Sequence, residues 1–316
     1  MSSPEQFSLV STDFKFKNQI GKYRGKVRDV YDLDHKLLII TTDRISAFDH
    51  ILSRPIPYKG QVLNQIAAHF MNAVKDICRV WLTECPDPNV SIGQKCSPIP
   101  IEMVVRGYLA GHAWRVYSGG GRSLCGVDFE LGLRENQKLD HAVITPTTKA
   151  SSGHDIDISI DEIKTRKIVS EDIIDKICRL SLQLFERGSK MAAERGLILV
   201  DTKYEFGLFD NDIFLMDEIH TPDSSRYFET AAYNENFKNG KAQVQLSKEF
   251  VREWLMAHGF QGKDDQIMPE MPDVFVWHIS ERYIDLFERI TGKPFQKPPQ
   301  DQPISRRIAS NLANYF

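Results

Sequence analysis

The sequence predicts a mixed protein of strands and helices, with a β-rich N-terminal part and one large or two coupled domains. Residues 21–42 join a glycine- and lysine-rich turn to the apolar run 37–40, which is typical of paired strands. Two more strand-like runs flank the turn-forming residues Asp210, Asn211 and Asp212 and predict a hairpin. Three other segments carry apolar residues at helical spacing.

Steps of three and four between apolar residues predict these three helices. The first contains Leu63, Ile66, Phe70, Val74 and Ile77, and the second contains Ile173, Ile177, Leu180 and Leu184 and ends before Gly196. The third begins at Pro272 and Asp273, has the stripe Val276, Ile279, Tyr283, Leu286 and Ile290, and is closed by Gly292 and Pro294.

The region between the first two helices predicts the domain organisation. Residues 85–100 are rich in Pro, Asn, Ser and Gly, so we expect a hinge there, followed by a strand over 99–105 that could cross between lobes. Residues 118–161 have few periodic runs and are expected to form long functional loops. The expected domains are 1–100 and 101–316.

Composition excludes several classes of protein. With 41% hydrophobic residues the chain can bury a core, yet no run of 18 apolar residues and no secretory signal pattern occurs, which predicts a soluble cytoplasmic protein without membrane contact. The five cysteines lack CxxC spacing, so structural zinc and disulfides are not expected. A net charge of −3 gives no general basic surface for nucleic acid, so any anionic ligand must be held by local clusters.

The first such cluster is a basic glycine loop. Lys22, Arg24, Lys26 and Arg28 lie within seven residues, and Gly25 lets the backbone approach a ligand closely. A loop of this kind can present N–H groups and a lysine to nucleotide phosphates, although the sequence is not a Walker A motif. A solvated edge hairpin with charges that discourage pairing is the alternative interpretation.

The second cluster lies on the predicted hairpin. Alternation along a strand puts Asp201, Lys203 and Glu205 on one face. If the turn is centred on Asn211, Glu205 stands opposite Asp217, and such opposed carboxylates need a cation, either Lys203 or a bound metal. Mg²⁺ that bridges nucleotide phosphates fits best. The alternative is a surface hairpin with polar outer residues.

The third cluster consists of two arginines near turns. Arg106 follows an apolar strand and precedes Gly107 and Gly111, and Arg226 lies in the turn-rich segment 217–228. Each suits a planar donor group for a phosphate or carboxylate. Taken singly, either could instead form a surface ion pair.

Together these blocks resemble the SAICAR synthetase (phosphoribosylaminoimidazole-succinocarboxamide synthase) family over nearly the whole chain. The matching blocks are GKVRDVY at 25–31, SAFD at 46–49, IPIEMVVRGYLAG at 99–111, TPTTKA at 145–150, LVDTKYEFG at 199–207 and DEIHTPDSSRYF at 217–228. The resemblance implies an α+β fold, with a kinase-like N-terminal lobe, a larger ATP-grasp-like lobe and the ATP cleft between them. It also implies a ligase of purine biosynthesis that uses ATP and Mg²⁺ to join L-aspartate to carboxyaminoimidazole ribonucleotide, as a monomer or small homo-oligomer.

The resemblance also assigns residues to roles. For the nucleotide and metal it implies Gly25, Lys26 and Arg28 at the ATP phosphates, Met103 and Val105 at adenine, Lys203 and Glu205 at ribose or metal, and Asp217 at Mg²⁺. For the ribonucleotide it implies Ser46, Arg106, His112 and Arg226, and it places Asp49 and Lys149 near the reacting groups.

His112 departs from the serine that usually follows Gly111 in this family. Its imidazole could donate to a phosphate and titrate near neutral pH, or it could be a stacked histidine without a ligand. Two other functions remain open, a small-molecule kinase and a non-enzymatic nucleotide sensor. The absence of an HRD catalytic loop argues against a protein kinase.

Overall fold

The computed structural model describes residues 3–149, 155–299 and 301–316 and shows the mixed α+β architecture that the sequence predicts. The chain forms two compact units. Unit 1 contains the chain up to Met71, with Trp81–Lys95 and Leu246–Phe316, and unit 2 contains Asn72–Val80 and Cys96–Gln245.

Unit 1 is built on a five-stranded antiparallel sheet in the order β1-β2-β3-β8-β7. A two-stranded hairpin, β4–β5, follows β3 in the chain. The strands are β1 (Gly21–Arg24), β2 (Arg28–Asp32), β3 (Lys36–Thr41), β4 (Ser46–Ala47), β5 (His50–Ile51), β7 (Leu82–Asp87) and β8 (Val90–Gln94). The helices are α1 (Lys59–Ala73, whose last two residues fall in unit 2), α6 (Glu249–Ala257), α7 (Asp273–Thr291) and α8 (Ile304–Asn311), with 3-10 turns at Pro4–Phe7 and Ala313–Tyr315.

The C-terminal helices belong to unit 1, whereas the expected domain boundary near residue 100 grouped them with the second lobe. Ile308 of α8 and Leu312, which follows its last residue, are fully buried in one core with apolar residues of β2, β3 and β8. Arg307 adds a buried ion pair, because its guanidinium donates to both carboxylate oxygens of Asp87 at 2.9 and 3.0 Å. The C-terminal segment therefore packs on the N-terminal sheet through long-range contacts that no local sequence pattern predicts.

Unit 2 is built on an eight-stranded sheet whose longest path is β14-β13-β9-β15-β16-β6. In addition, β12 pairs with β9, and β17 pairs with β15. The strands are β6 (Arg79–Val80), β9 (Ser97–Leu109), β12 (Gln137–Ile144), β13 (Thr147–Thr148), β14 (Ile156–Asp157), β15 (Leu197–Phe209), β16 (Asp212–Met216) and β17 (Ser225–Glu229), with a separate pair β10 (Ser123–Leu124) and β11 (Val127–Asp128). The helices are α2 (Gly111–Ser118), α3 (Ile160–Thr165), α4 (Glu171–Ala193) and α5 (Thr230–Lys238).

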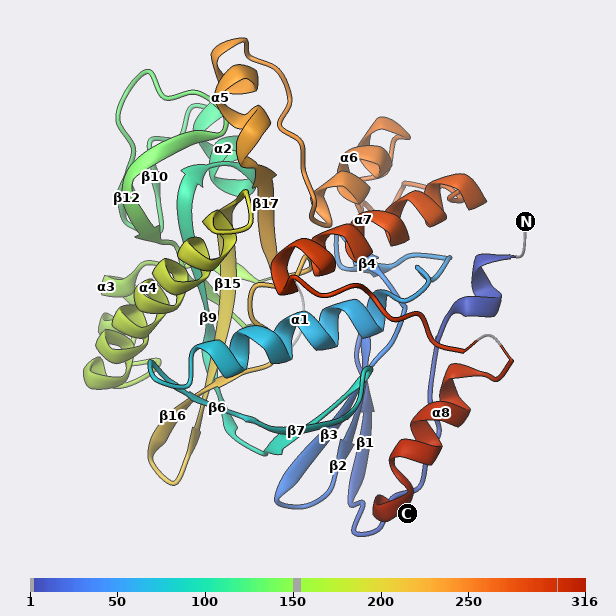
Figure 1. Ribbon diagram of the computed structural model, residues 1–316. Coiled ribbons are helices and arrows are strands. Elements are labelled where there is room, and N and C mark those ends of the chain that lie inside the picture. Colours follow the sequence, from blue (N-terminus) through green and yellow to red (C-terminus); the bar gives the residue numbers. More distant parts are fainter. Residues whose placement is uncertain (1–2, 150–154, 300) are drawn as a thin grey trace. The chain divides into compact units, whose positions relative to one another are not determined.

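The three predicted helices are confirmed as α1, α4 and α7. In α4, Ile174, Ile177, Leu180 and Leu184 are buried, and the helix packs against β15 and β9 (Figure 1). The Ser170 side chain caps its first turn by accepting from the Ile173 N–H. Gly292 closes α7 in the left-handed conformation at φ 67°, as the sequence predicts. Within the described ranges, no helix has the length and apolar character needed to cross a membrane.

The structure changes two expectations about irregular segments. Residues 118–161 were expected to form long loops, but the described part of this stretch also contains the strands β10 to β14, and β12 and β13 both pair with β9. Residues 85–100, where a hinge was expected, contain the second half of β7, all of β8 and the start of β9, and one boundary between the two units falls there, at Lys95 and Cys96. The pairing of β8 with β3 and of β12 and β13 with β9 joins residues far apart in the chain, which local composition does not predict.

Candidate functional site

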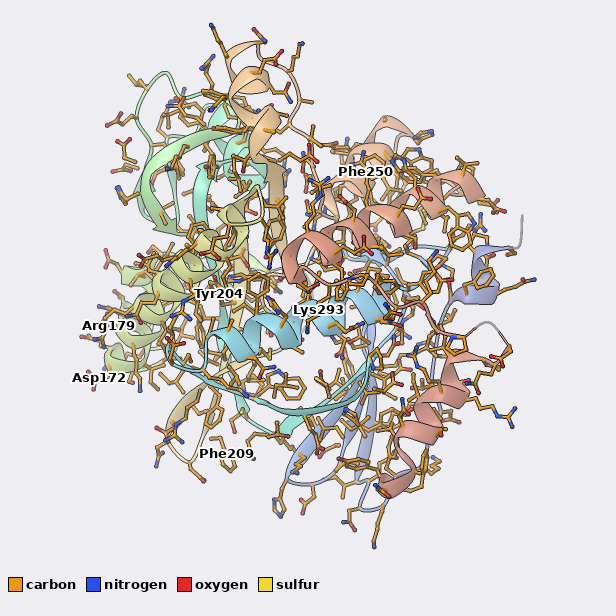
Figure 2. All side chains as sticks on the ribbon, in the orientation of Figure 1. Asp172, Arg179, Tyr204, Phe209, Phe250 and Lys293 are labelled. Carbon is orange, nitrogen blue, oxygen red and sulfur yellow. The ribbon has the colours of Figure 1, made fainter. Side chains whose placement is uncertain are left out.

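One face of β15 carries the charged residues that the alternation predicts. Lys203 Nζ lies 3.1 Å from Glu205 Oε1, and Asp201 points to the same face, where it meets two arginines. The intervening Thr202 and Tyr204 are fully buried on the opposite face, which packs in the core (Figure 2 labels Tyr204). A period of two thus sorts this strand into a polar face and a buried face.

The hairpin register differs from the expected one by a single residue. The turn consists of Asp210 and Asn211, both at positive φ (49° and 65°), so Phe209 pairs with Asp212 and Glu205 stands opposite Met216. A two-residue turn with both residues left-handed matches strand twist better than a turn centred on one residue. Asp217 lies just past β16, itself at φ 57°, and its charge contributes to the raised pKa of Lys203.

The acid that does face Glu205 is Glu102 on β9, which sequence reasoning missed. Lys203 Nζ lies 2.7 Å from Glu102 Oε1 and bridges the two carboxylates, while Lys149 makes an ion pair with Glu205. An acidic residue inside the otherwise apolar run 99–105 was the available signal. The cation that opposed carboxylates require is therefore present, but the opposed pair is formed between β9 and β15.

Electrostatics separate the two acids. Burial raises the pKa of Glu102, and the nearby negative charge of Glu205 acts in the same direction. Burial also acts to raise the pKa of Glu205, but Lys203 and Lys149 outweigh it and lower this pKa to about 2. Burial opposes the charged form of Lys203, yet Glu205 and Glu102 raise its pKa well above the usual value. Glu205 and Lys203 thus stay charged across the physiological range.

The second part of this face is a row of two arginines around Asp201. Asp201 pairs across the sheet with Arg106 on β9 and with Arg226 on β17. Its Oδ2 accepts from Arg106 Nη1 at 3.2 Å and from Arg226 Nη1 at 2.5 Å, while Arg106 Nε donates to Thr145 Oγ1 at 2.8 Å. Two guanidinium groups therefore meet at the carboxylate of Asp201.

The beginning of α2 adjoins this row. Gly111 has φ +54°, and a Cβ atom there would lie 2.2 Å from Arg226 Nη2, so only glycine lets the guanidinium lie against the backbone. The next residue, His112, places Nε2 2.7 Å from Asp157 Oδ2 on β14. Burial lowers the pKa of Arg106, and the negative charges of Asp201 and Asp157 oppose that shift. Arg106, Arg226 and His112 thus contact or lie near the same two acidic residues, Asp201 and Asp157.

In unit 1, the glycine loop and the β4–β5 hairpin lie together. The loop joins β1 to β2 and is closed by a bond from the Gly25 N–H to the Arg28 carbonyl at 2.8 Å. Lys26 Nζ lies 2.5 Å from Asp49 Oδ1, and both side chains are about half exposed. Ser46 lies on β4 of the same hairpin. The structure thus joins Lys26 and Asp49, which belong to two of the matching sequence blocks and lie 23 positions apart.

Met103 and Val105 do not match their expected role at adenine. Both side chains are fully buried in β9, and this strand is paired with β15 on one side and with β12 and β13 on the other. A buried side chain on a central strand offers no surface to a base. Both side chains belong to the core of unit 2.

The structure therefore combines an α+β fold with a basic glycine loop, a lysine–carboxylate cluster and a separate pair of arginines. A family model described as SAICAR synthetase matches residues 21–268. A phosphoribosylaminoimidazole-succinocarboxamide synthase from Bacteroides thetaiotaomicron is 54% identical over 311 residues, covering 98% of this chain and 99% of that protein. The chain belongs to the SAICAR synthetase family.

Solved structures agree with this assignment. The chain is similar to the SAICAR synthase of Saccharomyces cerevisiae complexed with SAICAR, with a TM-score of 0.76 and 31% identity over 90% of this chain and 99% of that one. It is also similar to a type-2 SAICAR synthetase in complex with ADP, with a TM-score of 0.67 and 25% identity over 87% and 100% of the two chains. The mixed α+β fold is therefore confirmed.

Proposed function

We propose that this chain is an ATP-dependent carbon–nitrogen ligase that joins the amino group of L-aspartate to the carboxylate of carboxyaminoimidazole ribonucleotide in purine biosynthesis. The observation that carries the proposal is the 54% identity to a phosphoribosylaminoimidazole-succinocarboxamide synthase over almost the full length of both chains. A small-molecule kinase is not favoured, because all the relatives and structures named above are SAICAR synthetases.

The reaction requires activation of a carboxylate, because its oxygen cannot leave as oxide at neutral pH. Transfer of the γ-phosphoryl group of ATP to a carboxylate oxygen gives an acyl phosphate and ADP. The aspartate nitrogen then attacks the acyl carbon, the carbon–oxygen bond breaks, phosphate leaves with the bonding pair and the nitrogen loses a proton. Three anionic reactants must be held together, so most of the catalysis is positioning and charge neutralisation.

For the nucleotide we propose the glycine loop of unit 1. Gly25 gives the backbone room, and Lys26 and Arg28 supply positive charge for phosphate oxygens. The half-exposed Lys26 ammonium is available for exchange from Asp49 to a ligand, which supports this role. Asp49 is proposed to lie near the reacting groups, as is Lys149 in unit 2.

For the metal we propose Glu205 and Asp217. Magnesium takes hard oxygen donors and commonly binds through one or two protein carboxylates, with water and phosphate in its other positions. The residues fit, because Glu205 keeps its negative charge, with a pKa of about 2, and already holds the cation Lys149. No group of three or more potential ligands occurs in residues 3–149, 155–299 and 301–316, so phosphate oxygens would complete the coordination. A bound magnesium ion would neutralise the phosphates, and Lys203 would orient Glu205.

For the ribonucleotide we propose Arg106, Arg226 and His112 of unit 2, whereas a role of Ser46 in unit 1 stays a prediction of the resemblance. The two guanidinium groups lie side by side on the carboxylate of Asp201, and their planar N–H geometry suits a phosphate or a carboxylate of the substrate. His112 would donate to the phosphate, with Asp157 orienting the imidazole. The likeness of the lobes to kinases and ATP-grasp enzymes, the ATP cleft, the cytoplasmic location and the oligomeric state stay predictions of the resemblance.

Product analysis tests the proposal. The purified protein is incubated with ATP, Mg²⁺, the carboxylated ribonucleotide and L-aspartate, and free phosphate and the amide product are measured. A ligase releases one phosphate for each amide formed and only when aspartate is present. Phosphate retained on a stable acceptor would establish a kinase instead, and nucleotide binding without turnover would establish a sensor.

A further inference from the structure

Arg44 is a buried arginine whose guanidinium is directed at the backbone of the glycine loop. Its side chain is only 3% exposed. Nε donates to the Lys26 carbonyl and Nη2 to the Gly25 carbonyl, both at 3.0 Å. A planar fork with five N–H groups is suited to holding several acceptors at once. The loop carbonyls are therefore held by a side chain from outside the loop.

The charge of Arg44 is neutralised within the protein. Nη2 also donates to Asp29 Oδ1 at 2.9 Å, and both partners of this ion pair are buried. The other oxygen of Asp29 accepts from the backbone N–H and hydroxyl of Thr12 at 2.7 and 2.9 Å. Because this buried pair offers no charge to a ligand, the contribution of Arg44 is geometric.

Arg44 also connects the loop to the hairpin that carries Asp49. The chain runs from Arg44 directly into β4, and the hairpin tip is Phe48 and Asp49, both left-handed at φ 50° and 65°. Such a conformation is strained for residues with a Cβ atom and needs support from its surroundings. Arg44 thus joins the loop backbone to the segment that leads into the hairpin, where Lys26 and Asp49 meet.

Support for the hairpin tip comes from a distant segment of unit 1. His50 Nε2 lies 3.2 Å from the Gly262 carbonyl, and a Cβ atom on Gly262 would lie 2.7 Å from the Phe48 Cβ. Phe260 packs edge-on against Phe48 and His50. These contacts support the hairpin tip. The backbone of the glycine loop is held by Arg44 and also by Thr42, whose N–H and hydroxyl both donate to the Val27 carbonyl.

We infer that Arg44 is a positioning residue for nucleotide binding, which holds the Gly25–Lys26 backbone against the Asp49 hairpin so that the Lys26 ammonium is presented to phosphate. The inference rests on the proposed role of the glycine loop. Arg44→Lys keeps the charge but replaces a planar fork by a single ammonium that cannot satisfy the same acceptors. We expect the KM for ATP to rise at least about tenfold and ADP binding to weaken equally, with the KM for aspartate within about twofold of the unchanged protein.

A matched control separates positioning from loss of stability. Arg307→Lys disturbs another buried arginine–aspartate pair in unit 1, with Arg307 13% and Asp87 0% exposed, that does not contact the glycine loop. It should lower the unfolding temperature comparably and leave ADP binding unchanged. Equal weakening of ADP binding in both variants would overturn the inference, because any destabilisation of the unit would then suffice.

Lys26→Met separates the inference from the proposed function. Calorimetric titration with ADP should show weak binding in both Lys26→Met and Arg44→Lys. Weak binding in Lys26→Met with normal binding in Arg44→Lys overturns only the role of Arg44. Normal binding in Lys26→Met removes the loop from the nucleotide site and the inference with it. If Arg44→Lys does not fold, Arg44→Gln, which keeps one planar donor group without charge, provides the same comparison.

Discussion

Burial of His220 predicts a pH-dependent contribution to stability that can be worked from the structure. His220 is fully buried, its Nε2 lies 2.6 Å from the Tyr204 hydroxyl, and a Cβ atom on Gly188 would overlap its ring. Burial lowers its pKa from 6.5 to about 3. His220 follows Asp217 by three residues in the chain.

The sign follows from proton binding in the two states. Between the folded pKa near 3 and the unfolded pKa near 6.5, the unfolded chain binds a proton that the folded chain does not. The stabilising effect of neutral, buried His220 is therefore complete above about pH 6.5 and is lost as the pH falls. At about pH 5 folded His220 is still almost wholly neutral, so the size of the effect depends almost only on the unfolded pKa. The free energy of unfolding contributed by His220 is then about 2 kcal/mol lower than at about pH 8.

The assay is urea unfolding of the natural protein and of His220→Gln at about pH 5 and about pH 8. The stability difference between the two proteins should be about 2 kcal/mol smaller at the lower pH. The two proteins are compared because a second group also makes stability depend on pH. Burial raises the pKa of Asp43 to about 7, so Asp43 lowers the free energy of unfolding as the pH rises, and this contribution cancels because it is present in both proteins.

Tyr204→Phe is the control. It removes the hydroxyl next to the imidazole but leaves His220 buried, so it should cost about 1–3 kcal/mol at both pH values without changing the slope. An equal difference between the natural protein and His220→Gln at the two pH values would refute the reasoning.

Four further predictions concern the proposed site. Arg106→Ala should chiefly raise the KM for the ribonucleotide, and an unchanged KM in steady-state kinetics would remove Arg106 from the substrate site. Asp217→Asn should nearly abolish turnover with the circular dichroism spectrum unchanged, whereas full activity would exclude a metal role. His112→Ser should retain activity but shift the pH profile of kcat/KM; an identical profile would make the imidazole a bystander. Gly111→Ala should displace the Arg226 guanidinium, which would lie 2.2 Å from the added carbon, and should raise the KM for the ribonucleotide about tenfold or more. The left-handed alanine itself should cost only about 1 kcal/mol of stability. An unchanged KM would contradict the close packing of Gly111 and Arg226.

Local sequence was enough for features that depend on neighbours in the chain. The 3.6-residue period of α4, the glycine that ends α7 and the alternation of Asp201, Lys203 and Glu205 were all predictable, because backbone geometry alone sets these spacings. The family assignment was predictable too, since several blocks in order identify it without a structure.

The register of the β15–β16 hairpin could not be predicted from local sequence alone. The turn residues at 210–212 predicted its existence, but the choice between a one-residue centre and the observed two-residue turn moved Glu205 from Asp217 to Met216. Turn conformation depends on how the flanking strands twist, and an error of one residue turns every partner to the other face.

The partners of the charged residues were decided by tertiary structure alone. Lys203 meets Glu102 from 101 positions away, and Arg106 meets Asp201 from 95 positions away, because β9 and β15 are neighbours in one sheet. Likewise, Ile308 of α8 and the adjoining Leu312 lie in the core of unit 1. The sequence by itself determined which chemical groups this protein has and on which face of its strand each lies. Long-range strand pairing decided which charges meet, because that pairing depends on the packing of the whole sheet and not on any local spacing.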